Sequence, residues 1–538
     1  MDPVADLAAA VHEAASALAG GEVAAPQLER PPKPELGDYS TNAAMMLTRA
    51  LRKPPRAIAE QLGDALAEQL GDHLERTEVA GPGFLNLFLA DSWYAGVVAG
   101  VARAGDDFGR GAQGARVIVE FVSANPTGPI TVASARHAAY GDSLARVLEL
   151  AGNDVDREYY VNDFGTQIQR FGASLSARAN HREPPEDGYR GGYVTELADR
   201  IGGAAGMDPE ELGRQGVELM LEAIETTLAR FGVRMDRYAR ESATHEAGAV
   251  EAKIAELRER GHIYDQEGAT WLRTSSLGDD KDRVLVRSSG ELTYFAADIP
   301  YHWTKHERGY ERAIVVLGAD HHGYTSRIRA AWQALGGDPA AFEVVIMQLV
   351  NLLEGGVRAQ MSKRAGAIVA LDDLLDDIGV DATRWYLLQR SHETAIDLDL
   401  ELARRQSQDN PVYYAQYAHA RIASILRKAG EDRVRAALAA DVGASGEQQH
   451  PSARALVKRL AAFPGEVQDA ADRRAPHRMT TYVTELAQDF SAFYRDCKVV
   501  GAAEEGGDED LRIVLSEVTR RTIESSLALL GVSAPAEM

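Results

Sequence analysis

Apolar residues recur at helical spacing near the N-terminus of the chain. This spacing predicts helices over residues 4–18 and about 56–74, with a Pro/Gly-rich loop at 31–42 between them. Residues 79–88 are typical of a turn followed by a strand. Together these elements predict a small α+β domain over residues 1–105.

Short apolar runs then alternate with helical patterns in two separate stretches, residues 115–170 and 284–380. Runs of this kind, such as 116–122 and 312–320, are typical of buried parallel strands. The alternation of strands and helices predicts a Rossmann-like, doubly wound parallel sheet, which we place at residues 106–380.

A mostly polar helical segment at about 171–283 interrupts this alternation, with strands near 269–273 and 282–286. We therefore expect an insertion between two halves of the sheet. From residue 371 onward helical spacing dominates, which predicts a C-terminal α-helical bundle over 381–538. The predicted fold class is multidomain α/β, in which the sheet domain with its insertion lies between the small α+β domain and the bundle.

Composition fits a globular protein, with 45% hydrophobic and 26% charged residues. No apolar run is long enough to cross a bilayer, and the first residues lack a basic stretch followed by an apolar core. These observations predict a cytoplasmic protein without membrane contact. The single cysteine, Cys497, excludes an internal disulfide framework and a cysteine-based zinc site.

Charge is distributed unevenly along the chain. The formal net charge is −23 at pH 7, yet residues 404–538 hold 18 Lys/Arg and 19 Asp/Glu. The C-terminal quarter is therefore the part least repulsive toward phosphate, which is compatible with nucleic-acid binding there.

Residues 116–150 combine a buried strand, a Pro/Gly turn and a helix. In the turn, Asn125-Pro-Thr-Gly-Pro129, backbone N–H groups can approach a ligand closely, and the helix that begins near Val132 adds a partial positive charge. Open α/β sheets collect ligands at strand ends of this kind. The pattern predicts a phosphate or nucleotide site.

Motifs spread over nearly the whole chain closely resemble those of arginyl-tRNA synthetases, including the regions that this family calls HIGH and KMSK. The resemblance rests on residues 36–42, 81–86, 120–129, 158–167, 293–298, 360–366 and 410–421. It implies a class I arginine–tRNA ligase that uses L-arginine, tRNA(Arg) and ATP with Mg²⁺, holds no metal of its own and acts as a monomer. It also implies that the N-terminal domain contacts tRNA and that the bundle binds the anticodon.

The resemblance implies an arginine pocket made for a planar cation with five donors. Glu120 and Asp298 would grip the guanidinium group. Tyr294 would pack on the aliphatic stem, and Asn125 would hold the α-amino end, with Ser123 in the same cluster. Glu120 ends an otherwise apolar strand, so its carboxylate needs a partner. Tyr294 and Asp298 lie four residues apart, on one face if the segment is helical.

The resemblance also implies an ATP site built from two segments. Lys363 is the expected electrostatic catalyst, because a positioned cation stabilises the charge that builds on a phosphoryl group during in-line attack. The implied catalytic residues are Lys363, Ser362 and Arg364, and the implied ATP-binding residues are Pro126, Thr127, Gly128, Thr131, Ala133, Ser134, Met361 and Lys363. Asp320 and His322 are candidates for contacts with substrate or the adenosine sugar; a metal there is disfavoured, because no third ligand is spaced to match.

Residues 131–134 depart from the family motif, since Thr-Val-Ala-Ser stands where the family has His-Val-Gly-His. In this class those imidazoles contact phosphate, and each loss is expected to cost about 1–3 kcal/mol of transition-state stabilisation. His137, one helical turn after Ser134, is either a partial substitute or a packing residue. Three hypotheses remain: an active ligase with a divergent HIGH motif, a catalytically inactive tRNA- or arginine-binding paralogue, and a paralogue that makes activated arginine for another pathway.

Overall fold

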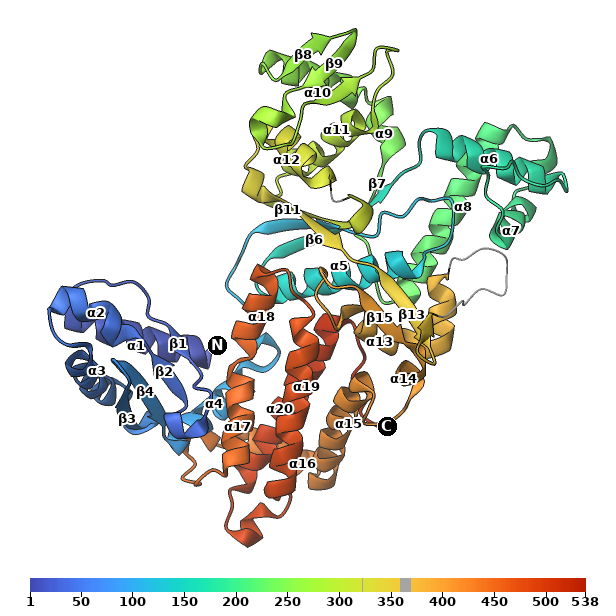
Figure 1. Cartoon of the computed structure of the whole chain (residues 1–538). Coiled ribbons are helices and arrows are strands. Elements are labelled where there is room, and N and C mark those ends of the chain that lie inside the picture. Colours follow the sequence, from blue (N-terminus) through green and yellow to red (C-terminus); the bar gives the residue numbers. More distant parts are fainter. Residues whose placement is uncertain (322, 359–368) are drawn as a thin grey trace.

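The computed structural model describes residues 1–321, 323–358 and 369–538. A parallel sheet with its helices occupies the centre of Figure 1, the N-terminal α+β domain lies to one side, and a bundle of long helices lies below. Among the described residues, no helix is both long and apolar enough to cross a membrane.

The N-terminal domain combines helices with an antiparallel sheet of order β1-β2-β4-β3. Asp2 caps the first helix by accepting hydrogen bonds from the backbone N–H groups of Val4 and Ala5. The helix predicted over 56–74 ends at Leu70, because Gly71 adopts a φ of +52°. The elements are α1 (Pro3–Ala19), β1 (Leu28–Glu29), β2 (Tyr39–Thr41), α2 (Ala43–Leu51), α3 (Pro55–Leu70), β3 (Leu74–Ala80), β4 (Phe84–Leu89) and α4 (Asp91–Ala104).

The central sheet is parallel and has the order β12-β11-β5-β6-β7. Its strands are β5 (Arg116–Glu120), β6 (Asp154–Val161), β7 (Arg237–Arg240), β11 (Arg312–Gly318) and β12 (Phe342–Met347). Chain order runs outward from β5 to β7 on one side and from β11 to β12 on the other. The winding therefore changes direction between β5 and β11, and a ligand crevice is expected outside the carboxyl ends of these two strands.

Three helices border this crevice. They are α5 (Val132–Leu150), which connects β5 to β6, α11 (Tyr294–Glu307), which precedes β11, and α12 (Tyr324–Ala334), which connects β11 to β12. Thr131 caps α5, since its Oγ accepts a hydrogen bond from the Ser134 N–H at 3.3 Å. The turn after β5 thus leads directly into a helix N-terminus at the crevice.

The range predicted as one insertion contains a strand of the main sheet. The chain leaves β6 for the helices α6 (Thr166–Ala179), α7 (Gly192–Arg200) and α8 (Pro209–Arg230), and then returns as β7. It leaves again for α9 (Glu241–Glu246), α10 (Ala249–Glu259) and an antiparallel sheet of β8 (Ile263–Gln266), β9 (Ala269–Leu272) and β10 (Arg283–Val286). The sequence pattern misses β7 because Arg237-Tyr-Ala-Arg240 carries no apolar run.

Helices dominate the C-terminal part of the chain, as predicted, although a small sheet of order β14-β13-β15 precedes the bundle. This sheet and its helices are β13 (Val350–Glu354), β14 (Val357–Arg358), α13 (Leu371–Leu388), β15 (Ile396–Asp399) and α14 (Leu400–Arg404). The bundle consists of α15 (Pro411–Ala429), α16 (Glu431–Ala439), α17 (Pro451–Ala461), α18 (Phe463–Asp472), α19 (Arg478–Asp496) and α20 (Glu509–Leu530).

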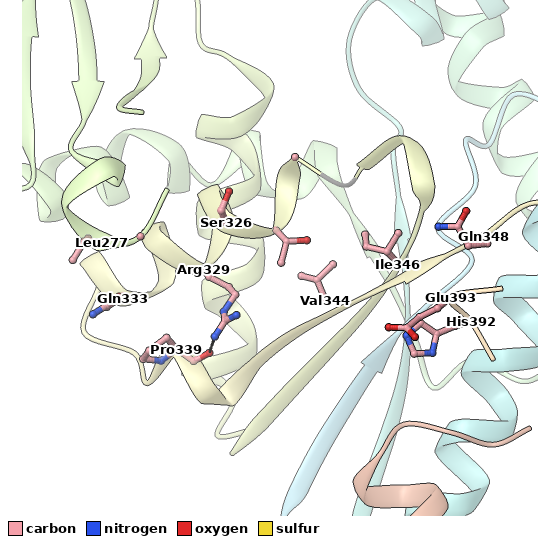
Figure 2. Close-up of a pocket in the computed structure, with 13 residues that line it drawn as sticks. Leu277, Ser326, Arg329, Gln333, Pro339, Val344, Ile346, Gln348, His392 and Glu393 are labelled. Atoms are coloured by element: carbon pink, nitrogen blue, oxygen red, sulfur yellow. Dashed lines mark hydrogen bonds between the residues drawn. The ribbon is translucent and has the colours of Figure 1, made fainter. Parts of the chain in front are cut away.

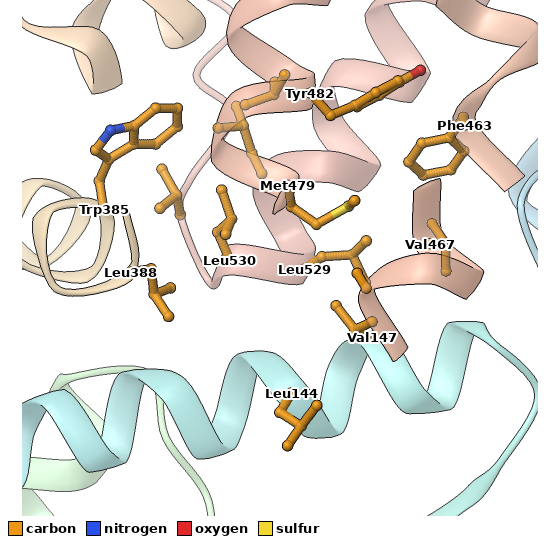
Figure 3. Close-up of a cluster of buried hydrophobic side chains, with 14 of the residues drawn as sticks. Leu144, Val147, Trp385, Leu388, Phe463, Val467, Met479, Tyr482, Leu529 and Leu530 are labelled. Atoms are coloured by element: carbon orange, nitrogen blue, oxygen red, sulfur yellow. The ribbon is translucent and has the colours of Figure 1, made fainter. Parts of the chain in front are cut away.

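One apolar core runs through all three regions. It extends from Leu7 in α1 to Val532 after α20. Figure 3 shows the part where α5 meets the bundle: Val147 of α5 points toward Leu529 at the end of α20. The helix that borders the crevice is therefore packed into the bundle along its C-terminal half.

Polar contacts reinforce this junction. The Tyr140 hydroxyl donates to the Arg474 carbonyl at 2.5 Å, and the Ser143 hydroxyl donates to the Leu529 carbonyl at 2.7 Å. Arg384 of α13 is fully buried; it pairs with Asp142 of α5 at 2.6 Å and donates to the Leu530 carbonyl at 2.6 Å. Because buried donors need partners, these contacts fix α5 against the bundle.

Candidate active site

A cavity of about 430 Å³ lies at the switch point between β5 and β11. It brings together six residues that the sequence predicted for the site, from the ends of two strands and from helices α5 and α11: Glu120, Ser123, Asn125, Ser134, Asp298 and Asp320. The cavity therefore joins the predicted arginine-binding residues to the start of α5, where ATP contacts were predicted.

The chain turns sharply where β5 enters the cavity. Val122 has a φ of 69° and Ser123 a φ of 40°, and the Ser123 N–H donates to the Phe121 carbonyl at 3.0 Å. This is a γ-turn with positive φ, a strained form that is rare for a β-branched residue. It places the Ser123 hydroxyl where it donates to Glu120 Oε1 at 3.2 Å and accepts from the Tyr160 N–H at 3.1 Å.

Glu120 is held from behind by a buried cation. Lys305 of α11 is fully buried, and its Nζ lies 3.0 Å from Glu120 Oε2 and 3.2 Å from Glu158 Oε1. Glu120 itself is 3% exposed, and its Oε2 makes no hydrogen bond of good geometry to any described residue. Lys305 therefore balances the charge of Glu120 before any ligand is bound.

The second acid bound by Lys305 belongs to the sheet rather than to the cavity. Glu158 is fully buried in β6, accepts a hydrogen bond from the Tyr301 hydroxyl at 3.0 Å, and pairs with Arg308. Burial alone would raise the pKa of Glu158, but Lys305 and Arg308 lower it below its usual range. Glu158 is therefore the fixed counter-charge that keeps Lys305 in place.

Two further acids near the cavity, Asp298 and Glu241, have pKa values that are raised, whereas that of Glu158 is lowered. Burial raises the pKa of Asp298 to about 7, with Glu120 adding to the rise and Tyr324 and Arg327 opposing it. Burial likewise raises the pKa of Glu241 to about 7, and Asp298 adds to that rise. Glu241 is 5% exposed at the start of α9, immediately after β7. Asp298 and Glu241 thus form an acidic pair without enough positive charge around it to keep their pKa values in the usual range.

Helix α5 also places an imidazole in the cavity. His137 lines it together with Ser134, and a Cβ added at Gly318 would lie 3.7 Å from His137 Cε1, so the ring abuts the end of β11. Burial, with a contribution from Arg136, lowers the pKa of His137 to about 4, although Asp320 opposes this. The ring is therefore neutral at pH 7 and offers one donor and one acceptor.

Several predicted residues are not among those that line the cavity. Tyr294, the first residue of α11, is 72% exposed. Pro126, Thr127, Gly128, Thr131 and Ala133 form the turn and the first positions of α5, and the Thr127 carbonyl accepts a hydrogen bond from the Tyr193 hydroxyl at 2.8 Å. This turn is packed against α7, which bears Tyr193.

Met361, Ser362, Lys363, Arg364 and His322 lie outside the described residues. The first residues described after 359–368 adjoin the start of α5: the Val132 N–H donates to the Val369 carbonyl at 3.1 Å, and Thr131 forms a β-bridge with Ala370. Within the described ranges no group of three His, Cys, Asp or Glu residues is arranged to hold a metal ion.

Sequence reasoning missed the residues that complete the cavity and its surroundings. They are Tyr160, Asn162, Tyr301, His302, Tyr324, Glu241 and Lys305. Two of them carried a usable signal: Asn162 and Glu241 each directly follow a strand of the parallel sheet, where α/β sites collect ligands. Lys305 carried none, because a lysine within a polar helix segment is normally a surface residue.

Three family models match the chain. A model described as "Arginyl tRNA synthetase N terminal domain" matches residues 5–89, one described as "tRNA synthetases class I (R), catalytic domain" matches 106–186 and 210–422, and one described as "DALR anticodon binding domain" matches 415–538. The fold, the cavity at the switch point and these matches define a class I aminoacyl-tRNA synthetase.

Individual proteins give a narrower result. The chain is 46% identical to an arginine–tRNA ligase of Frankia alni, over 95% of this chain and 94% of that protein. It is 45% identical to an arginine–tRNA ligase of Kineococcus radiotolerans, over 99% of this chain and all of that one. A solved structure of Thermus thermophilus arginyl-tRNA synthetase has a TM-score of 0.77 and 26% identity, with 99% of both chains covered. The chain belongs to the arginyl-tRNA synthetase family.

Proposed function

We propose that this chain is an arginine–tRNA ligase, and the observation that carries the proposal is the acidic cavity at the switch point. The arginine carboxylate attacks the α-phosphate of ATP, forming arginyl-adenylate and releasing pyrophosphate. A hydroxyl of the tRNA 3′ end then attacks the arginyl carbonyl, and AMP leaves. We propose tRNA(Arg) as the acceptor, Mg²⁺ as the companion of ATP, a monomeric state and a cytoplasmic location.

The arginine side chain has a natural place in this cavity. Asp298 is half-buried and Glu241 is buried, and a guanidinium group supplies the delocalised charge and the several donors that these two acids lack. Glu120 already has Lys305 beside it, so we assign the larger share of guanidinium binding to Asp298. Ser123 and Asn125 line the same cavity and are proposed to contact the α-amino end.

Arginine binding is expected to release protons below pH 7. Asp298 and Glu241 start from pKa values of 3.8 and 4.5 and reach about 7 in the empty site. The native state thus holds more protons than the unfolded chain between about pH 4 and 7, and its stability falls as pH rises through this window. A bound cation favours the ionised acids, so arginine affinity should rise between pH 5.5 and 7.5, by up to about tenfold per pH unit for each proton released.

Calorimetry in two buffers of different ionisation enthalpy counts these protons. Proton release near pH 6 that vanishes above pH 8 is the expected result, and Asp298→Asn should release fewer protons than the unchanged protein. Arginine binding with no proton exchange at pH 6 would contradict the assignment.

The ATP phosphates need donors in a chain whose HIGH segment carries no histidine. The start of α5 provides backbone N–H groups, and Ser134 and the neutral His137 line the cavity beside it. The Thr131 hydroxyl caps α5 by accepting from the Ser134 N–H, and its own proton can still be donated to a phosphate oxygen, so Thr131 stays a proposed ATP contact. Lys363 remains the proposed source of positive charge at the transferring phosphoryl group, and Ser362, Arg364 and Met361 remain proposed companions.

Lys363→Ala is expected to slow adenylate formation by about 10- to 100-fold, because a lost cation removes about 1–3 kcal/mol of transition-state stabilisation. Arginine affinity should change little, because the acidic pair that binds the side chain is unaltered. Single-turnover adenylate formation and equilibrium arginine binding measure the two effects separately. An unchanged rate would refute the role given to Lys363.

The hypothesis of an inactive paralogue, suggested by residues 131–134, gains no support from the relatives. These proteins match the chain over nearly their whole length and are named arginine–tRNA ligases. Aminoacylation of tRNA(Arg) with labelled arginine decides the matter. Labelled tRNA is the expected product; tRNA that binds normally but stays unlabelled at high enzyme concentration would overturn the proposal.

A further inference from the structure

Helix α11 carries a row of polar side chains behind the predicted guanidinium site. Asp298, His302 and Lys305 follow one another at spacings of four and three residues, so they share one face of the helix. Asp298 lines the cavity, whereas His302 is only 4% exposed and Lys305 is fully buried. Buried polar groups need hydrogen-bond partners, so the contacts of this row determine what it can do.

Lys305 determines where the His302 ring carries its proton. The Lys305 Nζ lies 3.5 Å from His302 Nδ1. Because an ammonium group only donates, His302 Nδ1 accepts. Burial, with a contribution from Lys305, lowers the pKa of His302 well below its usual value, so the ring is neutral and its one proton is on Nε2. Phe342 of β12 packs against this ring at 5.1 Å between ring centres, nearly perpendicular to it, and helps to hold its orientation.

His302 in turn determines what the Tyr324 hydroxyl does. The two groups are 2.9 Å apart, and since His302 Nε2 carries the proton, the Tyr324 oxygen accepts. Burial and Asp298 raise the pKa of Tyr324 well above its usual value, so the hydroxyl keeps its proton. The Tyr324 hydroxyl is therefore left to donate, and its acceptor is the Asp298 carboxylate. A donor fixed at this position favours the ionised form of Asp298.

Tyr324 differs from the rest of its helix in the surface that it faces. Among the residues of α12, only Tyr324 lines the cavity. Figure 2 shows other α12 residues, among them Ser326 and Arg329, along a separate cleft of about 1020 Å³. The Ser326 hydroxyl donates to Asp279 at 2.8 Å. Helix α12 thus presents one hydroxyl to Asp298 and another to an acid outside the cavity.

Titratable groups from several elements surround Asp298. They are Glu120 of β5, Tyr160 of β6, Glu241 after β7, Lys305 of α11, and Tyr324 and Arg327 of α12. Burial and the acids outweigh the cations, so the pKa of Asp298 is raised to about 7. Among the groups that lower this pKa, Tyr324 acts through a hydrogen bond, whereas Arg327 and Lys305 act through their charge.

We propose that Tyr324 is a positioning residue for arginine: its hydroxyl, oriented by His302 and through His302 by Lys305, holds the Asp298 carboxylate ionised and aimed at the guanidinium group. This inference rests on the proposed function and adds a hydrogen-bond series, Lys305–His302–Tyr324–Asp298, that acts behind the ligand. Tyr324 acts through Asp298, so its effect depends on the protonation of that acid.

Tyr324→Phe is expected to raise the pKa of Asp298 from about 7 to about 8, because a hydrogen bond to the charged form is lost. Arginine affinity, measured by calorimetry on the full chain, should therefore fall about tenfold at pH 6, about fivefold at pH 7 and less than about twofold at pH 8.5. A merely structural role of the hydroxyl would lower arginine affinity by the same factor at every pH.

The matched control is Ser326→Ala, which removes a hydroxyl from the same helix that bonds a different carboxylate, Asp279. Its arginine affinity should equal that of the unchanged protein at every pH. His302→Leu removes the donor to Tyr324 and should weaken arginine binding at pH 6 by about two- to threefold. His302→Gln keeps one donor and one acceptor, so it should bind arginine as the unchanged protein does.

A loss in Tyr324→Phe that is equal at all pH values, or no loss at all, would overturn the proposal. Equal weakening by His302→Gln and His302→Leu would overturn the part given to His302. The carboxyl ¹³C signal of Asp298, identified by its absence in Asp298→Asn, provides a readout that needs no ligand. In the empty protein it should titrate about one pH unit higher in Tyr324→Phe. This shift in a protein that binds no arginine would support the hydrogen-bond series while the ligase proposal failed, and an unmoved signal would overturn the series.

Discussion

Replacement of Lys305 by methionine is expected to destabilise the central sheet by about 3–5 kcal/mol, the usual cost of removing one partner from a buried ion pair. Lys305 is fully buried between Glu120 and Glu158, and its Nζ lies 3.6 Å from the centre of the Tyr301 ring. Methionine has a similar length but no charge, so two carboxylates lose the cation they share. The opening free energy of β5 and β6 amides, from native-state hydrogen exchange, measures the effect without assuming two-state unfolding of the whole chain.

Lys253→Met is the matched control for this change. Lys253 of α10 also has two acidic partners, Glu256 at 2.9 Å and Glu307 at 2.8 Å, but both partners are substantially exposed. Its replacement should cost no more than about 1 kcal/mol. Addition of Glu120→Gln to Lys305→Met should recover part of the loss, because one of the unpaired charges is then removed. Equal costs for the two lysine variants would show that burial of Lys305 has no energetic consequence.

Asp298→Asn is expected to raise the KM for arginine by about 30- to 3,000-fold. Loss of one member of a buried, hydrogen-bonded charge pair costs about 2–5 kcal/mol, and each 1.4 kcal/mol is tenfold in affinity. The same change should stabilise the empty protein at pH 8, because burial disfavours the ionised Asp298 whose pKa is raised to about 7. A variant that is more stable and yet binds arginine poorly would separate a binding role from a structural one.

Asp320→Asn provides the comparison within the same cavity. Asp320 also lines it, but its side chain is 81% exposed, so solvent screens its charge. Its replacement should change the KM for arginine by less than tenfold. Arginine activation and thermal stability, measured at pH 8 for Asp298→Asn and Asp320→Asn, test both expectations. A similar loss of arginine affinity in both variants would contradict the assignment of the guanidinium site to Asp298.

The sequence pattern was sufficient to predict those elements whose residues form continuous apolar runs. The strands β5 and β11 are continuous apolar runs, and α5 follows a Pro/Gly turn, so the switch point between them was predictable from local pattern alone. The strand β7 was not, because it is a short edge strand, mostly not buried, whose sequence Arg237-Tyr-Ala-Arg240 carries no apolar run. The strand β8 was missed for the same reason of length and polarity, whereas β9 and β10 lie where the sequence predicted strands, near 269–273 and 282–286.

Part of the site was predictable, because Glu120 ends β5, Asp320 follows β11, and Asp298 belongs to a motif. The positions of the remaining site residues depend on which helix covers the crevice and on how deeply its side chains are buried. Residues four apart share a helix face, but this spacing does not tell that Asp298 reaches the cavity while Tyr294 stays 72% exposed. The pairing of Lys305 with Glu158 joins α11 to β6 across the fold, and no local spacing encodes it. The domain limits at residues 105 and 380 stay predictions.

The contacts of α5 with the bundle restrict how this chain can evolve by recombination. Leu144 and Val147 of α5 belong to the same core as Leu529 and Leu530. The Ser143 hydroxyl also donates a hydrogen bond to the Leu529 carbonyl. A recombination event that exchanged the bundle alone between two relatives would set a foreign surface against the helix that begins at the catalytic cavity. The bundle and α5 are therefore expected to pass between lineages as one linked unit, with matched changes on the two sides of their shared surface.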